Sequence, residues 1–335
     1  MLMVVGGAAI GREGPTIQIA GCIFRKVNQL IPKSWPQVSK KNMIMTGAAA
    51  GLAAAFNTPL GGIVFAVEEL TRTHINYFKI AILSAVIIAG LTAQALLGPY
   101  LYLGFPNVSN LSPYIFFAVI AASTIAGFAG GLMSKWIVGI LKWKSRLKKI
   151  SWEIAYVLGC AVVLVLIAMF LNDSVLGSGK EQMTNLLFTD EKYGGWLAPV
   201  LRIIGPLLSF TTGAAGGVFA PSLSAGACIG SWCAEMFELS NTNSNLLILA
   251  GMVAFLTGVT RSPFTSAILV LEMTDRHSVI FHLMLAGIVA VVVASLVDRR
   301  SLYDHLKHQY MNDLENDDIR AGGVDDKTKD KGAAR

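Results

Sequence analysis

GAAIGREGP, at residues 7–15, recurs further along the chain as GAAGGVFAP, at residues 213–221. A shift of 206 residues superimposes the two stretches, and a shift of 204 residues continues the match beyond them. The pairs joined by the second shift are Gly47, Ala50, Leu52, Pro59, Glu68 and Arg72 with Gly251, Ala254, Leu256, Pro263, Glu272 and Arg276. Prolines and glutamates that recur in the same order indicate an internal repeat, because chance matching of small residues would not pair them.

Each copy of the repeat contains a break at which a new helix is expected to begin. Thr58-Pro59 and Ser262-Pro263 both place a hydroxyl residue before a proline, which is typical of a helix start capped by the hydroxyl. The apolar segments on either side are too short to cross a bilayer alone. Short helices interrupted at matching places in two halves of a membrane protein predict a binding site near the middle of the bilayer. The sequence alone leaves open whether the two copies are parallel or inverted.

The composition is that of a polytopic membrane protein. Of the 335 residues, 54% are hydrophobic and 14% are charged, against roughly 25% charged residues in soluble proteins. The apolar residues form runs close to the ~20 residues needed to cross hydrocarbon, and the charges collect between them. The runs lie at 78–97, 114–136, 154–171 and 281–297. We therefore expect the chain to lie in a lipid bilayer, and a soluble protein with buried helices is the alternative that the composition disfavours.

A basic cluster at 142–149 separates two of these apolar runs. By the positive-inside rule, this cluster predicts a cytoplasmic loop. Nucleic-acid binding is the rival interpretation of such a cluster, but its position between two membrane spans argues against it. We expect no nucleic-acid partner.

The sequence contains no constellation typical of an enzyme. The histidines are scattered near the ends of segments, and no Ser/His/Asp set, metal-ligand spacing or phosphate-binding loop appears. The cysteines lie in apolar segments, where a small hydrophobic role fits better than a disulfide or a metal site. These residues are Cys22, Cys160, Cys228 and Cys233. We therefore predict no catalytic residues, no metal and no cofactor.

The two glycine-rich turns suit an anion. Each leads into a helix start, where unpaired N–H groups and about half a positive charge are available. Glycines let the backbone approach a ligand closely, and partial charges bind weakly enough for fast passage. Close packing of helices through small residues is the alternative interpretation. The motif residues of the two turns are Gly11, Gly14, Pro15, Gly217 and Pro221.

Glu13 lies inside the first turn and is the strongest functional candidate. A carboxylate in an apolar helix start is costly unless it has a partner or a task. Its charge is attracted to the same N–H groups that would hold an anion, and two negative charges at ~4 Å repel by about 4 kcal/mol at an effective dielectric constant of about 20. Carboxylate and anion therefore exclude each other, and protonation of Glu13 would free the site. The alternative is a carboxylate that only satisfies a helix terminus.

A second acidic spot is Glu68-Glu69, at the end of an apolar segment. The local sequence leaves an interfacial carboxylate pair as an equal alternative to a functional role, and the same holds for Glu272. Arg12 is a candidate structural partner for a carboxylate or a carbonyl.

On these residues the chain resembles the CLC family of chloride channels and chloride/proton exchangers. The similar motifs are GREGP at 11–15, GAAAGLAAAFNTPLGGIVFAVEEL at 47–70, GAAGGVFAP at 213–221 and LTGVTRSPFTSAILVLEMT at 256–274. Their order and spacing follow the family over about residues 6–303. The resemblance implies an all-α integral membrane fold, built as an inverted repeat of broken and re-entrant helices. It also implies a homodimer with one pore in each subunit.

The same resemblance implies roles for single residues. Glu13 matches the gating glutamate, and Glu69 matches the inner proton-transfer glutamate of the exchangers. Val218 and Phe219 match the backbone donors to the anion, and Tyr303 matches the tyrosine whose hydroxyl contacts the central anion. The implied function is voltage- or proton-gated anion transport in the form of chloride/proton antiport, with chloride or a similar small anion and the proton as the transported ions. A passive chloride channel of the same family is the alternative.

The chain also departs from the family pattern. The helices that precede GREGP in the family are absent, and so is the GSGIP-type motif whose serine coordinates the central anion; GSGK at 177–180 lies too far downstream to replace it. We therefore expect a fragment, a wrongly assigned start or a truncated product, and a non-transporting subunit is a further alternative. The predicted transmembrane domain covers 1–308, and a polar, disordered cytoplasmic tail covers 309–335. No CBS domains are expected, and the expected location is the inner membrane of a bacterium.

Overall fold

The computed structural model describes residues 2–312, except 33, 36–37, 71–78, 99–100, 110, 148, 190–191 and 193. In this part of the chain the secondary structure is helical, apart from an isolated β-bridge between Gly11 and Gly217. The first half contains α1 (Leu2–Val5), α2 (Glu13–Leu30), α3 (Lys40–Phe56), α4 (Pro59–Phe65), a π-helical turn η1 (Ala66–Leu70) and α5 (Lys79–Leu97). The expected all-α fold class is confirmed for these residues.

The described residues after α5 form further helices. In chain order these are α6 (Ile115–Lys144), α7 (Ile150–Phe170), the 3-10 turn η2 (Asp173–Val175), α8 (Lys180–Phe188), α9 (Leu197–Thr211), α10 (Phe219–Met236), α11 (Asn241–Thr260), α12 (Pro263–Thr274), the 3-10 turn η3 (His277–Val279) and α13 (Ile280–Val297). A last helical stretch covers 302–312. Residues 309–312 of the predicted tail are therefore helical, and the rest of that tail lies outside the described residues.

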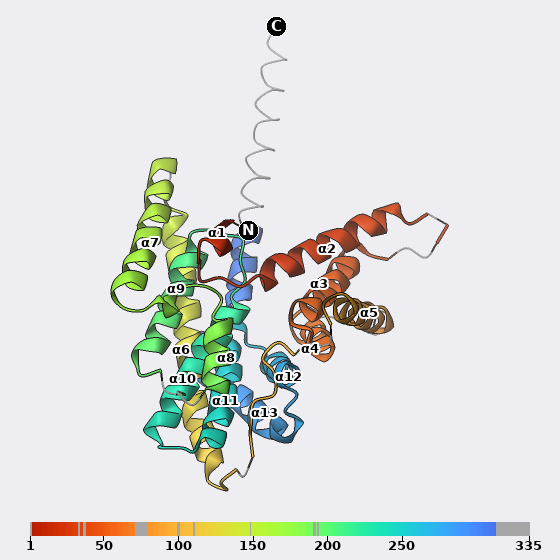
Figure 1. Ribbon diagram of the computed structural model, residues 1–335. Helices are drawn as coiled ribbons and strands as arrows, with labels where there is room; N and C mark the ends of the chain where they lie inside the picture. The colour runs from red at the N-terminus through yellow and green to blue at the C-terminus, as the bar shows by residue number, and fades with distance from the viewer. Residues whose placement is uncertain are drawn as a thin grey trace.

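The helices flank a central set on two sides. Figure 1 shows α2, α3, α4 and α5 on one side of the molecule and α7 on the opposite side, with α6, α10 and α11 between them. The helices α2 and α10 are the two copies of one repeat element. One copy therefore lies in the group α2–α5, and the other lies in the central set.

Among the described residues, four helical segments are long and apolar enough to cross a membrane: Ile115–Lys144, Ile150–Phe170, Asn241–Thr260 and His277–Val297. Three of them confirm predicted apolar runs. The run predicted at 78–97 forms α5, whose apolar part, Ile80–Leu96, is shorter than a span, and residue 78 is not described. The fourth segment, α11, precedes the break at Pro263, where the sequence predicted an apolar segment too short to span. That prediction is wrong for this segment, because the helix extends back through polar residues to Asn241.

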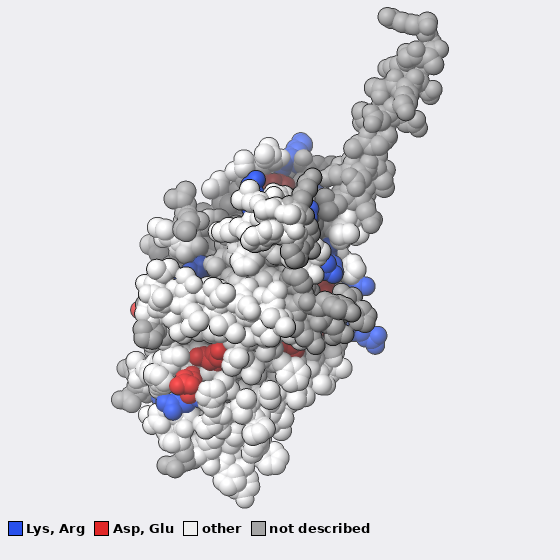
Figure 2. Space-filling view, turned by 90° about the vertical axis from the view of Figure 1, so that its right-hand side faces the viewer, with Lys and Arg blue, Asp and Glu red and all other residues white. Residues whose placement is uncertain are grey.

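The surface agrees with a bilayer environment. Large apolar side chains such as Leu158, Val162 and Met169 are exposed along α7, which a soluble protein would bury. Figure 2 shows a face on which uncharged side chains predominate. The chain is therefore an integral membrane protein, as its composition predicts.

The centre of the molecule is packed through small residues. A Cβ atom added to Gly226 of α10 would lie 2.2 Å from the carbonyl oxygen of Gly251 in α11. A Cβ added to Gly130 of α6 would lie 2.5 Å from the carbonyl oxygen of Phe255, also in α11. Side chains are thus excluded at both contacts, which brings the three helices together at backbone distance, as small residues do in membranes. This packing fixes the position at which α10 begins.

The two predicted helix breaks are confirmed, but their caps are not the predicted ones. Helices begin at Pro59 and at Pro263, yet neither Thr58 nor Ser262 makes a side-chain cap hydrogen bond. The cap of α12 is Glu68, which accepts hydrogen bonds from the Phe264 and Thr265 amides at 3.2 and 2.7 Å. A carboxylate is a stronger acceptor than a hydroxyl and also complements the positive end of the helix, which explains why it replaces the hydroxyl.

The other half repeats this cap with the partners exchanged. Glu272, the repeat partner of Glu68, accepts hydrogen bonds from the Leu60 and Gly61 amides at 3.0 and 2.6 Å. A contact in which each copy offers the same groups to the other is the signature of a twofold relation. The repeat seen in the sequence is therefore a structural repeat, with a local twofold axis passing between α4 and α12.

Candidate functional site

The two glycine-rich turns contact each other, and the contact is reciprocal, like the one between α4 and α12. The Gly11 amide donates to the Gly217 carbonyl at 2.8 Å, and the Gly217 amide donates to the Gly11 carbonyl at 2.7 Å. The contact is so close that a Cβ atom added to Gly14 would lie 3.0 Å from the Gly217 Cα atom. The N-termini of α2 and α10 are thereby held side by side, with Pro15 and Pro221 in their first turns.

Glu13 begins α2, and its side chain is buried at this junction, with 1% of its surface exposed. The backbone N–H of Ala220, in the first turn of α10, interacts with its carboxylate. The Oε2 atom has no hydrogen-bond partner, although it lies so close to the turns that a Cβ at Gly11 would be 1.8 Å from it. The carboxylate therefore occupies the space directly in front of the α10 N-terminus.

The residues at the start of α10 are buried around this carboxylate. Val218 precedes the helix and Phe219 begins it, with 1% and 3% of their surfaces exposed. The first backbone hydrogen bond of the helix runs from the Ser222 amide to the Val218 carbonyl. The amides that precede Ser222 belong to the unpaired N–H groups of a helix start, and they can receive an anion or a carboxylate.

Phe219, the first residue of α10, also lines a cavity of about 470 Å³. Its ring lies 6.3 Å from the ring of Tyr303 and 6.0 Å from the ring of Phe65. Gly14, Phe219, Tyr303 and Glu69 all line this cavity. The structure therefore brings Phe219, Tyr303 and Glu69 together around one space, whereas Val218 is not among the residues that line it.

Glu69 reaches the cavity from the π-helical turn η1, which follows α4. Its Oε2 atom accepts a hydrogen bond from the Ser262 hydroxyl at 2.8 Å. Its neighbour Glu68 points elsewhere, to the N-terminus of α12. The two adjacent carboxylates thus have different surroundings, and the interfacial-pair interpretation of Glu68-Glu69 does not describe them.

Two aromatic residues that the sequence analysis did not single out extend the wall of the site. The Phe56 ring lies 6.5 Å from Phe219 and 5.1 Å from Tyr102 in an edge-on contact. Phe56 is fully buried, and Tyr102 is 4% exposed. Phe56 follows an alanine-rich run and lies two residues before the break at Thr58-Pro59. This position beside a helix break is the feature of the sequence that could have indicated its role in the site.

The helical stretch that carries Tyr303 is anchored at its start. The Arg261 side chain donates to the carbonyls of Ala294 and Asp298 at 2.9 and 3.0 Å, and a His305 ring nitrogen lies 2.9 Å from Asp298 Oδ2. Burial alone would raise the pKa of Asp298, but the Arg300 amide and the His305 ring hold that pKa below its ordinary value. The anchor fixes the turn at 298–301 and with it the position of Tyr303.

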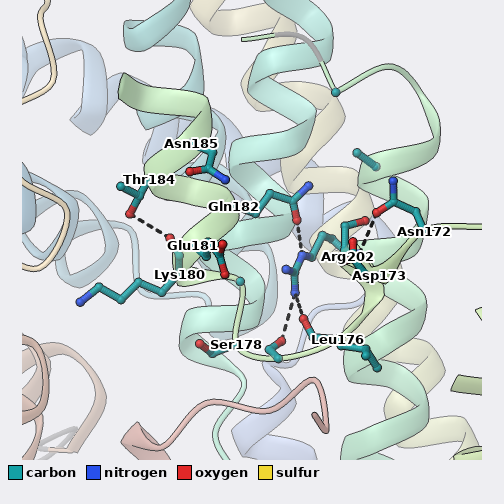
Figure 3. Close-up of a pocket in the computed structure, with 15 residues that line it drawn as sticks. Asn172, Asp173, Leu176, Ser178, Lys180, Glu181, Gln182, Thr184, Asn185 and Arg202 are labelled. Carbon is teal, nitrogen blue, oxygen red and sulfur yellow. Dashed lines mark hydrogen bonds between the residues drawn. The ribbon is translucent and has the colours of Figure 1, made fainter. Parts of the chain in front are cut away.

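A separate cavity of about 930 Å³ lies at GSGK, residues 177–180 (Figure 3). Arg202, which is 3% exposed, donates from Nη1 to the carbonyls of Leu176 and Gly177 at 3.1 and 3.0 Å, and from Nε to Gln182. The turn is thus tied to α9 through its carbonyl groups, which is a structural role. Arg12, the candidate structural partner for a carboxylate or a carbonyl, is exposed beside Glu13.

Comparisons with known proteins agree with this geometry. A family model described as a voltage gated chloride channel matches residues 1–295. A slow cyanobacterial Cl⁻/H⁺ antiporter has 24% sequence identity to this chain and a TM-score of 0.81, over 93% of this chain and 74% of its own. A CLC-type fluoride/proton antiporter has 21% identity and a TM-score of 0.75, over 89% and 73%. A eukaryotic CLC transporter has 20% identity and a TM-score of 0.69, over 90% and 53%.

At these identities the structural likeness establishes the fold alone. The described residues therefore adopt the all-α membrane fold of these transporters, as the sequence motifs imply.

Proposed function

The chain belongs to the CLC family of voltage gated chloride channels, and on that premise we propose that it exchanges chloride, or a similar small anion, for protons across a lipid bilayer. The observation that carries this proposal is the position of Glu13. Its buried carboxylate lies against the first turn of α10 and leaves one oxygen without a hydrogen-bond partner.

In this proposal the anion is bound by groups around the start of α10. The backbone amides of Val218 and Phe219 and the hydroxyl of Tyr303 are its donors. The support is the burial of Val218 and Phe219 beside Glu13 and the 6.3 Å separation of the Phe219 and Tyr303 rings. Because the donors carry only partial charges, an anion can bind and still leave quickly.

Glu13 acts as both the gate and the outer proton carrier. Its carboxylate and an anion compete for the same donors, since two negative charges at ~4 Å repel by about 4 kcal/mol at an effective dielectric constant of about 20. Protonation removes this repulsion and weakens the attraction of Glu13 for the α10 amides. The side chain can then leave the site, and an anion enters as the proton is taken up.

Glu69 is the inner proton carrier. It lines the cavity shared with Phe219 and Tyr303. A proton taken up by Glu69 would pass the ring of Phe219 to reach Glu13. Together, the carboxylate at the start of α10 and the carboxylate at the cavity would provide the proton path that an exchanger needs and a passive channel does not.

The oligomeric state, the location and the lack of enzymatic activity are proposed from the family. We propose a homodimer, the inner membrane of a bacterium as the location, and no enzymatic activity, catalytic residue, cofactor or metal. The cyanobacterial source of one of the similar antiporters supports the bacterial location.

Passive anion conduction is the second candidate, because the family model itself is described as a channel. A simultaneous record of chloride and proton flux from liposomes containing the chain separates the possibilities. An exchanger moves protons against their gradient when chloride flows down its own gradient. Chloride flow without protons would identify a channel, and the absence of both fluxes would identify a non-transporting subunit.

A further inference from the structure

Ser262 stands at the start of α12, but its hydroxyl does not cap that helix. The amides at the helix start are already taken by Glu68, through Phe264 and Thr265. The hydroxyl is therefore available for another acceptor, and it donates to Glu69 Oε2 at 2.8 Å. Ser262 is 3% exposed, so water does not readily replace it in this hydrogen bond.

The internal repeat provides a comparison within the same molecule. Shifted by 204 residues, Ser262 corresponds to Thr58 and Glu69 corresponds to Met273. Thr58 also precedes a capped helix start, and its hydroxyl is fully buried with no hydrogen-bond partner. A helix start of this kind therefore does not require the hydroxyl contact. The hydroxyl contact is present only for Ser262, which faces the carboxylate of Glu69, and the residue equivalent to Glu69 in the other copy is Met273.

Other charged and titratable groups also face Glu69. Lys41 of α3 and Asp304 and Lys307 of the last helical stretch line the same cavity, together with Tyr303. Glu68, the preceding residue, directs its carboxylate to the α12 amides. These groups set the background field at Glu69, whereas Ser262 contacts the carboxylate directly.

We propose that Ser262 is a positioning residue for Glu69, holding its carboxyl group at the cavity and setting the pH range in which it exchanges protons. This inference rests on the proposed role of Glu69 in proton transfer. A serine hydroxyl can donate a hydrogen bond and can also accept one. It donates to ionised Glu69 and accepts from protonated Glu69, so the side chain keeps its place in both states. The donated bond favours the ionised form.

Ser262→Ala removes this bond and leaves the cap by Glu68 in place. A hydrogen bond to a charged group is worth about tenfold or more in an equilibrium constant, so the pH of half-maximal proton flux should move about one pH unit upward. Ser262→Thr keeps the hydroxyl and should restore the original pH profile. Thr58→Ala is the matched control, because it removes the equivalent hydroxyl, which makes no hydrogen bond. Each variant is measured in liposomes over a series of pH values, after size-exclusion chromatography has established that it is folded.

Infrared titration of the carboxyl band that disappears in Glu69→Gln gives a readout independent of transport. The same upward shift is expected there for Ser262→Ala. An unchanged pH profile and an unchanged infrared titration in Ser262→Ala would overturn the inference, and so would an equal shift in Thr58→Ala. If Glu69→Gln itself left proton flux intact, the proposed function would fail, whereas the infrared titration would still decide whether Ser262 controls Glu69.

Discussion

Gly11 and Gly217 exchange both of their backbone hydrogen bonds, with N···O distances of 2.8 and 2.7 Å, and they occupy equivalent positions in the two halves of the chain. This reciprocal contact joins two helix starts and creates the junction that Glu13 fills. A side chain is excluded at Gly217, because a Cβ there would lie 2.7 Å from the Gly14 backbone nitrogen. The site therefore lies at the contact between the two copies of the repeat.

Glu13→Gln should remove proton exchange while anions still pass. The glutamine side chain cannot take up and release a proton, and without its charge it competes weakly with an anion for the amides at the start of α10. Proton flux from liposomes should fall by about a hundredfold or more, with chloride flux retained. Proton-coupled transport at the normal rate in Glu13→Gln would remove Glu13 from the mechanism.

Glu69→Gln should stop proton movement and leave anion movement. The substitution removes the proton carrier from the cavity but leaves the α10 N-terminus and Tyr303 unchanged. Chloride and proton fluxes are recorded from the same liposomes. Glu153→Gln, an exposed carboxylate in the first turn of α7, is the control and should transport like the original chain. If Glu69→Gln keeps its proton flux, the inner proton path does not use this residue.

The reciprocal caps should contribute almost equally to stability. Glu68→Ala and Glu272→Ala each leave two helix-start amides without acceptors, at a cost of about 2 kcal/mol in the free energy of unfolding. Thermal unfolding in detergent measures both variants, with Glu153→Ala as a control that should change the free energy by less than about 0.5 kcal/mol. A large loss in one variant alone would show that the two caps are not energetically equivalent.

The anchor of the Tyr303 helix should make stability depend on pH. Because the folded-state pKa of Asp298 is held below its ordinary value, its stabilising contribution is present above the ordinary pKa of an aspartate. That contribution is lost as the pH falls through the folded value. Between about pH 5 and pH 3 the original chain should lose about 1 kcal/mol more than Asp298→Asn, which has no carboxyl group to titrate. Parallel melting-temperature curves for the two proteins would contradict this assignment.

The sequence predicts much of this architecture, because the repeat is visible in it. The two glycine turns, the helix starts at Pro59 and Pro263 and the placement of Glu13 at a helix start all follow from local pattern. These features depend on neighbouring residues, whose preferences are readable along the chain.

The caps could not be predicted from local pattern, because Glu68 and Glu272 act on helices about 200 residues away. A hydroxyl before a proline favours a local cap, and only the twofold relation brings a stronger acceptor to each helix start. Glu68 and Glu272 lie at the same offset from Pro59 and Pro263. This pairing is the feature of the sequence that could have pointed to the caps. The contact between Ser262 and Glu69 likewise depends on this tertiary placement.

The central claim is that Glu13 and an anion compete for the N-terminus of α10, and bromide-soaked crystals test it most directly. Anomalous diffraction from Glu13→Gln should show a bromide peak beside the amides at the start of α10, where the Glu13 carboxylate contacts the Ala220 amide in the original chain. The original chain, with this carboxylate in place, should show a weaker peak or none there. Absence of bromide at this position in Glu13→Gln, at a concentration that labels other sites, would contradict the account.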